Sequence, residues 1–208
     1  MGKITELRTR GKKVELCIDG TLSFSVSVAL ANRMRLSPGQ VLSAEEINHL
    51  METETTERCF DAALRLLKYR PRSRVELKQR LIRRGFCEIS VDKVLKALEE
   101  RGLIDDRAFA QYWKDNRVRF KPKSARLIRL ELKQVGISPE LAGAVTELLD
   151  EESLAYDAAV RKARVLRSCS EEEFSKRLYN HLQRRGFADA VIRSVLRRLA
   201  EVHNANDE

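Results

Sequence analysis

The chain has 208 residues with 40 Lys and Arg, 31 Asp and Glu, and a formal net charge of +9. Hydrophobic residues make up 43%, enough to bury a core, so the composition excludes a disordered chain. Nine glycines, four prolines and 6% aromatic residues argue against a β-sandwich or barrel, while the 34% charged fraction favours a mainly α protein. The excess positive charge predicts an anionic partner without identifying it.

Residues 1–51 are expected to form a small α+β segment. Two runs in which apolar residues alternate with other residues, 14–18 and 22–26, flank Asp19-Gly20. This pattern is typical of a β-hairpin, because the turn needs a positive φ that glycine tolerates. Residues 4–8 can add a third strand. Three strands are marginal by themselves, so we expect the segment to pack on the next part of the chain.

Two short helices are expected next. Ser27 can cap a helix that runs to Met34, and Ser43 with Glu46 has the spacing of a capping box that opens the second helix. Residues 52–58 are polar, and we interpret them as a linker or as the exposed start of a further helix. The first 58 residues carry no net charge, so the whole positive excess lies in residues 59–208.

From Cys59 onward the apolar spacing becomes helical, and the sequence repeats about every fifty residues. Gly85, Gly136 and Gly186 each follow apolar residues placed eight and four positions earlier, and an apolar residue comes directly after each glycine. The pattern predicts a helix that ends at a left-handed glycine. Each such helix has one expected helix before it and one after it. The sequence therefore predicts a mainly α protein of three tandem three-helix repeats in an elongated array, covering residues 52–104, 105–150 and 151–208.

The flanking helices have expected core positions and caps. Apolar residues after each glycine are Val91, Val94, Leu95 and Leu98; Leu141, Ala144, Val145 and Leu148; and Ile192, Val195, Leu196 and Leu199. The preceding helices carry Phe60, Ala63, Leu64 and Leu67; Phe109, Tyr112, Trp113 and Phe120; and Ala155, Ala159, Ala163 and Leu166. Expected N-caps are Ser73 and Ser170, each with a capping-box Glu three residues later, and Ser138 before Pro139.

The sequence has no recognisable catalytic or metal-binding constellation. The four cysteines, Cys17, Cys59, Cys87 and Cys169, form no CxxC pair, so we expect them reduced and expect no zinc site. Phosphate-loop, dinucleotide, zinc-protease and nucleophile-elbow patterns are absent. The plain reading of Asp105-Asp106 is a helix cap, and that of His181 a partly buried or surface histidine. We expect no enzyme, catalytic residue, cofactor or metal, and, without a signal peptide or membrane span, a cytoplasmic protein.

Basic residues concentrate at the joint between the first and second helix of repeats one and two. Residues 65–84 hold nine basic side chains against one acid, and residues 114–133 hold eight against two. Such runs can be solvated helix faces, but two clusters at equivalent positions favour contact with an anion. Nearby aromatic residues can stack on bases or belong to the core, and core is the better reading for Trp113. Candidate partner- or DNA-binding residues are Arg70, Arg72, Arg74, Lys78, Arg80, Arg83, Arg84, Arg117, Arg119, Lys121, Lys123, Arg126 and Arg129.

The chain resembles the RecX regulatory proteins over residues 60–199. Four sequence patterns carry the resemblance: Ser73-x-x-Glu76-Leu77-x-x-x-Leu81 with Gly85-Phe86; Gly102-Leu103-Ile104-Asp105-Asp106-x-x-Phe109-Ala110; Ile128-x-x-Glu131-Leu132-x-x-x-Gly136-Ile137; and Arg185-Gly186-Phe187 with Ile192. The chain departs from the family at Ser124, where glycine is usual but serine can cap a helix. It also departs at Val135, where lysine is usual and a positive charge is lost.

The resemblance implies a monomeric modulator of the RecA recombinase in DNA recombination, repair and the SOS response. Such a protein would lie in the groove of the RecA–DNA filament, limit filament growth, and lower ATPase and strand exchange; stimulation in this lineage stays open. Weak binding to single- and double-stranded DNA is also implied. The alternative is a sequence-nonspecific DNA-binding protein with helix-turn-helix-like units. Reversing the charge of Arg70, Arg72 and Arg74 is expected to weaken filament binding without unfolding the chain.

Overall fold

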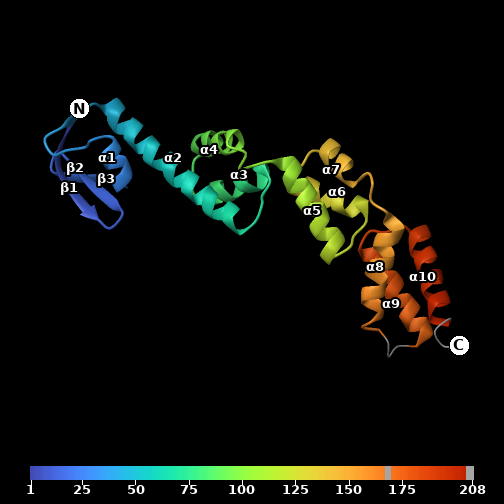
Figure 1. Cartoon of the computed structure of the whole chain (residues 1–208). Coiled ribbons are helices and arrows are strands. Elements are labelled where there is room, and N and C mark those ends of the chain that lie inside the picture. Colours follow the sequence, from blue (N-terminus) through green and yellow to red (C-terminus); the bar gives the residue numbers. More distant parts are fainter. Residues whose placement is uncertain (167–169, 205–208) are drawn as a thin grey trace. The chain divides into compact units, whose positions relative to one another are not determined.

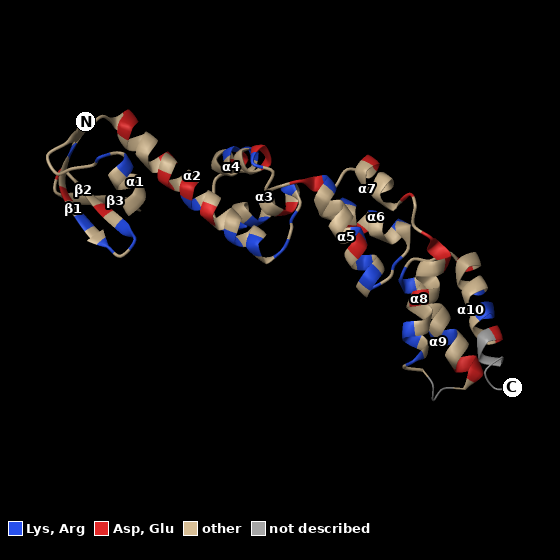
Figure 2. Cartoon of the chain, in the orientation of Figure 1, with Lys and Arg blue, Asp and Glu red and all other residues tan. Residues whose placement is uncertain are grey.

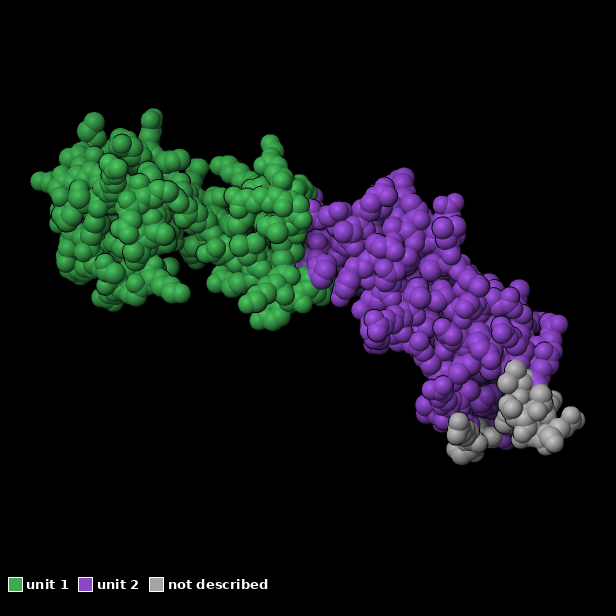
Figure 3. Space-filling model, in the orientation of Figure 1, with its two compact units in different colours: residues 1–70, 77–103 green, residues 71–76, 104–208 purple. Residues whose placement is uncertain are grey.

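The computed structural model describes residues 1–166 and 170–204. The chain divides into two compact units, shown in Figure 3. Unit 1 comprises residues 1–70 and 77–103, and unit 2 comprises residues 71–76 and 104–208. The first few residues of one helix, α3, thus belong to unit 2, although the rest of that helix belongs to unit 1.

Unit 1 begins with a four-stranded antiparallel sheet, drawn in blue in Figure 1. Its strands are β1 (Gly2–Arg10), β2 (Lys13–Ile18), β3 (Thr21–Ser27) and the two-residue β4 (Val41–Leu42), in the order β3-β2-β1-β4. Asp19 and Gly20 both have positive φ, 50° and 83°, which confirms the expected hairpin turn. One face of the sheet buries Ile4, Leu16 and Val26.

Two helices cover this sheet. Helix α1 (Val28–Arg33) is capped by Ser27, and helix α2 (Ala44–Tyr69) opens with the expected capping box of Ser43 and Glu46. The expectation of a short helix followed by a linker is wrong, because α2 continues unbroken for 26 residues through positions 52–58. Residues 52–58 are polar but contain neither glycine nor proline, and Glu54, 5% exposed, accepts a hydrogen bond from the Ser27 amide at 2.8 Å. That contact anchors the middle of α2.

The remainder of unit 1 is helical. Helix α4 (Glu88–Glu100) packs against the carboxyl-terminal half of α2, and residues 77–83 come from α3 (Arg74–Arg83). The expected core positions of α4 are all buried, whereas Leu64 of α2 is 38% exposed and Leu66 is buried in its place. The described buried apolar residues here are Cys59, Ala62, Ala63, Leu66, Leu77, Leu81, Val91, Val94, Leu95 and Leu98.

Unit 2 contains the second and third helical repeats. Their helices are α5 (Asp106–Phe120), α6 (Ala125–Gln134) and α7 (Pro139–Thr146), then α8 (Glu151–Ala163), α9 (Glu171–Arg184) and α10 (Asp189–Asn204). Each triplet has its own core: Phe109, Ile128, Leu132 and Ile137 lie in one, and Ala155, Leu178, Leu182 and Ile192 in the other. Mainly helical tandem repeats after a small strand segment are therefore confirmed.

Four expected core residues of repeat two lie at the surface, and one of them, Tyr112 of α5, is 42% exposed. Helix α7 ends at Thr146, so Leu148 is 97% exposed and Leu149 packs on the cores instead. Ala144 is also exposed, whereas Ala142 is buried. Phe120, the last residue of α5, is 59% exposed, and the chain leaves the helix directly after it.

The three repeat glycines end their helices as expected. Gly85, Gly136 and Gly186 have φ of 88°, 84° and 84°. In each case the glycine amide donates to the carbonyl three residues earlier and the following amide donates to the carbonyl five residues earlier. This is the Schellman arrangement, in which the apolar residue after glycine folds back onto the helix. Phe187 and Ile137, at that position, are buried.

Candidate partner interface

The two basic clusters flank the starts of α3 and α6, and Figure 2 shows Lys and Arg gathered at the carboxyl end of α5. The structure separates the candidate residues into those that serve the fold and those that face solvent. The number of charges in the sequence does not make this separation. Whether a cation serves the fold depends on which acidic side chain lies close enough to pair with it.

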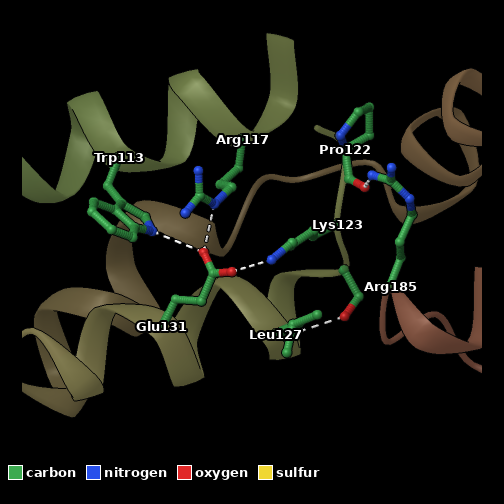
Figure 4. Close-up of polar contacts among 8 residues, drawn as sticks. Trp113, Arg117, Pro122, Lys123, Leu127, Glu131 and Arg185 are labelled. Atoms are coloured by element: carbon green, nitrogen blue, oxygen red, sulfur yellow. Dashed lines mark hydrogen bonds and ion pairs between the residues drawn. The ribbon is translucent and has the colours of Figure 1, made fainter. Parts of the chain in front are cut away.

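Glu131 of α6 holds two of the candidates (Figure 4). Its carboxylate accepts hydrogen bonds from Arg117 Nε at 2.6 Å, from Lys123 Nζ, and from the Trp113 indole Nε1 at 3.0 Å. The Arg117 guanidinium also lies over the Trp113 ring, 4.6 Å from its centroid. Burial raises the pKa of Glu131, but the three donors outweigh it and hold that pKa below the ordinary value. Glu131 therefore ties Arg117 of α5 and Lys123 of the α5–α6 connection to α6.

Two candidates in the first cluster are similarly paired. Arg72 is 8% exposed and forms an ion pair with Glu76, four residues later. Lys78 pairs with Glu88 and Asp92 of α4 at 2.6 and 3.0 Å, which raises its pKa through hydrogen bonds to both acids. A charge-reversal test that includes Arg72 therefore changes a buried ion pair, so it does not report on partner binding alone.

The other candidates are half-buried or exposed. Arg70 and Arg74 are half-buried. On α6 the basic residues Arg126 and Arg129 lie with Leu130 on one solvent-facing side, because their spacing matches one helix face. The exposed candidates are Arg80, Arg83, Arg84, Arg119, Lys121, Arg126 and Arg129.

Within unit 2, acidic side chains at the start of one repeat bind the second helix of the repeat before it. Asp105 caps its own helix α5, as expected, but Asp106 Oδ1 accepts from the Arg74 amide at 2.8 Å. Glu151 Oε1 likewise accepts from the Ala125 amide at 2.6 Å. Sequence reasoning missed this contact, although an acid after each Asp N-cap is a visible signal.

A second contact recurs at each of these joints. Ser73 Oγ donates to the Val135 carbonyl, and the Ser124 amide donates to the Arg185 carbonyl at 3.0 Å. Arg185 Nη1 also donates to the Pro122 carbonyl at 2.7 Å, as Figure 4 shows. Each partner carbonyl lies directly before a repeat glycine. The start of one second helix therefore packs against the end of the next.

Both departures from the expected family pattern have structural roles. Ser124 Oγ accepts from the Leu127 amide at 3.1 Å and caps α6, as the sequence predicted. Val135 packs on the core of repeat two.

The remaining predicted features have ordinary environments. His181 is half-buried, and Arg185 Nε donates to its Nε2 at 2.8 Å. Cys17 and Cys59 are buried, Cys87 is exposed, and Cys169 lies outside the described residues. In residues 1–166 and 170–204 no three His, Cys, Asp or Glu side chains gather as a metal site would require. No helix in that part of the chain combines the length and apolar character needed to cross a bilayer.

Comparison with known proteins matches each helical repeat. Family models described as the first, second and third three-helix domains of RecX match residues 59–98, 105–145 and 150–196. The regulatory protein RecX of Chlorobium phaeobacteroides is 39% identical over 140 residues, which cover 67% of this chain and 92% of that protein. That of Clostridium beijerinckii is 26% identical over 210 residues, covering 97% and 98%.

Solved structures show the same fold. A crystal structure of regulatory protein RecX covers 94% of this chain and 98% of its own, with a TM-score of 0.66 at 22% identity. RecX from Lactobacillus salivarius covers 71% of this chain and 98% of its own, with a TM-score of 0.59 at 20% identity.

Proposed function

Because this chain belongs to the RecX family, we propose that it is a non-enzymatic regulator of the RecA recombinase. In this proposal it binds along the groove of the RecA–DNA filament in the cytoplasm, limits filament growth, and lowers ATPase activity and strand exchange. The relatives that match most of the chain bear the name regulatory protein RecX, which supports the regulatory role.

The observation that carries the proposal is a cluster of basic residues near the joint between the first and second helices in each of two tandem repeats. A filament presents the same surface on every protomer, so a chain with repeated contacts gains affinity by multivalency. Repeat one offers exposed cations at Arg80, Arg83 and Arg84, and repeat two offers Arg126 and Arg129 on α6. The limits of the repeats, at residues 52–104, 105–150 and 151–208, stay a prediction. Each variant below is assigned to a repeat by these limits.

The direct test adds the purified protein to RecA on DNA at near-stoichiometric amounts. We expect lower DNA-dependent ATPase and slower strand exchange, whereas unchanged rates of both would overturn the proposal. The double reversal Arg126→Glu/Arg129→Glu should weaken the inhibition. Arg197→Glu, an exposed reversal on α10 outside the candidate set, serves as the control and should retain it.

Direct DNA binding is the competing function. About six phosphate contacts would make the affinity for bare duplex fall with salt at a log–log slope of about −5. Strong binding to the filament together with weak binding to bare DNA would reject this alternative. Equal affinity for filament and bare DNA would favour it over the RecA proposal.

A further inference from the structure

A five-residue pattern occurs at the same place in repeats one and two. Tyr69-Arg-Pro-Arg-Ser73 and Phe120-Lys-Pro-Lys-Ser124 share an aromatic residue, a basic residue, proline, a second basic residue and serine. We call them the two pentapeptides. They lie 51 residues apart, which is also the spacing of Gly85 and Gly136. In repeat three the four residues before Ser170 contain neither an aromatic residue nor proline.

The proline sets the local geometry of both pentapeptides. A residue before proline avoids the helical conformation, so each helix ends at the aromatic residue. Arg70 accordingly has φ −165° and ψ 158°, and Lys121 has φ −143° and ψ 70°. The second basic residue, Arg72 or Lys123, pairs with an acid of the following helix, Glu76 or Glu131.

The aromatic rings remain outside the cores. Tyr69 is 86% exposed and Phe120 is 59% exposed. Aromatic rings contribute to stability when they leave water, and these two do not pack in a core. Both are therefore accessible to a partner at equivalent positions of two repeats.

One cation lies over the Phe120 ring, and two more belong to its surroundings. The Arg119 guanidinium lies 5.1 Å from the ring centroid, and Arg161 Nη1 donates to the Arg119 carbonyl at 3.0 Å. Lys121 is exposed directly after the ring. The one acid in residues 116–131, Glu131, is already engaged by Arg117 and Lys123. The end of α5 therefore offers an aromatic face beside several positive charges.

We infer that Phe120 and Tyr69 bind single-stranded nucleic acid by stacking on its bases, while the neighbouring cations contact its phosphates. Each nucleotide supplies both a planar base and a negative charge, which is the combination that the pentapeptides can recognise. The carboxylates of an acidic protein surface supply charge but do not stack on an aromatic ring as a nucleic-acid base does. Bases in a duplex are already stacked on each other, so a single strand is the expected form.

The test measures affinity by fluorescence anisotropy with labelled oligo-dT and with an abasic oligomer of the same length. The abasic strand keeps the phosphates but offers no base. We expect Phe120→Ala and Tyr69→Ala each to weaken oligo-dT binding about fivefold or more, the lower end of base–aromatic stacking, and to leave abasic binding unchanged. Tyr112→Ala, which removes a 42% exposed ring from α5 outside the pentapeptides, should leave both affinities unchanged.

The remaining outcomes contradict the inference. An equal loss on both oligomers, no loss on either, or no detectable binding of the wild-type chain to oligo-dT would each overturn it. Unchanged oligo-dT affinity with weakened binding to the RecA filament would assign the rings to a protein contact. Filament binding is measured separately. The oligonucleotide measurement contains no RecA, so its failure leaves the regulator proposal to its own ATPase test.

Discussion

The Glu151 carboxylate, at the start of α8, accepts a hydrogen bond from the Ala125 amide at the start of α6. The first four amides of a helix lack partners within the helix, and they carry the positive end of its dipole. A carboxylate from the next repeat satisfies one of them. Asp106 makes the equivalent contact with the Arg74 amide. The same kind of hydrogen bond, from an acid of one repeat to the second helix of the repeat before it, therefore occurs twice in the chain.

Glu151→Ala should therefore destabilise unit 2. Loss of a charged cap leaves the Ala125 amide without its acceptor, which costs about 1–2 kcal/mol. Thermal unfolding followed by circular dichroism measures the change. Glu147→Ala removes an exposed carboxylate at the end of α7 and serves as the control. Equal melting temperatures for the two variants would contradict the capping role.

Replacement of the repeat glycines by alanine should distinguish two costs, the backbone strain of a left-handed residue and the steric overlap of an added Cβ. Alanine at any of the three is strained by a left-handed φ, which costs about 1–2 kcal/mol. A Cβ on Gly136 would also overlap the Val75 side chain, and one on Gly186 would lie 2.6 Å from Ser124 Oγ, whereas nothing lies within 4 Å at Gly85. Gly136→Ala and Gly186→Ala should lose more stability than Gly85→Ala in chemical denaturation. Equal losses of stability in all three variants would show that the close contacts at Gly136 and Gly186 add no cost to the backbone strain.

Arg72→Ala is expected to weaken the fold by about 3 kcal/mol. It leaves the Glu76 carboxylate, 12% exposed, without this ion-pair partner, and breaking a buried pair is far costlier than losing a surface one. Urea unfolding gives the size of the effect. Arg83→Ala removes an exposed guanidinium from α3, the helix that carries Glu76, and should change stability by less than about 0.5 kcal/mol. Similar values for both would refute the structural role.

Acid should destabilise unit 2 partly through His181. Burial and the nearby charges of Arg185, Lys162 and Arg184 lower the pKa of His181 from 6.5 to about 4. The unfolded chain therefore takes up a proton that the folded chain refuses, and stability falls as the pH drops from about 6.5 to about 4. His181→Gln should flatten this part of the stability–pH curve measured by denaturant unfolding. His49→Gln, an exposed histidine of α2, is the control. An unaltered curve in the first variant would exclude His181 as the cause.

Much of the fold depends on short-range signals. The Asp19-Gly20 turn, the serine caps and the repeat glycines each act within a few residues, so the chain reveals them without its tertiary structure. The errors arose where such signals are weak. No breaker marks the end of a short helix before residue 52, and apolar periodicity alone does not distinguish Leu148 from Leu149 when α7 ends at Thr146.

The sequence by itself determined the repeats, their helix ends and the net positive charge of the helical part. Only the tertiary structure decided which cations serve the fold and which face solvent. Lys123 and Lys121 are two residues apart and chemically identical, yet Lys123 pairs with Glu131 while Lys121 is exposed. Ion pairing falls off steeply with distance, so the outcome depends on where a separate helix places its acid. Asp106 likewise accepts from the Arg74 backbone amide, 32 residues away in the sequence, because the fold brings the starts of α3 and α5 together.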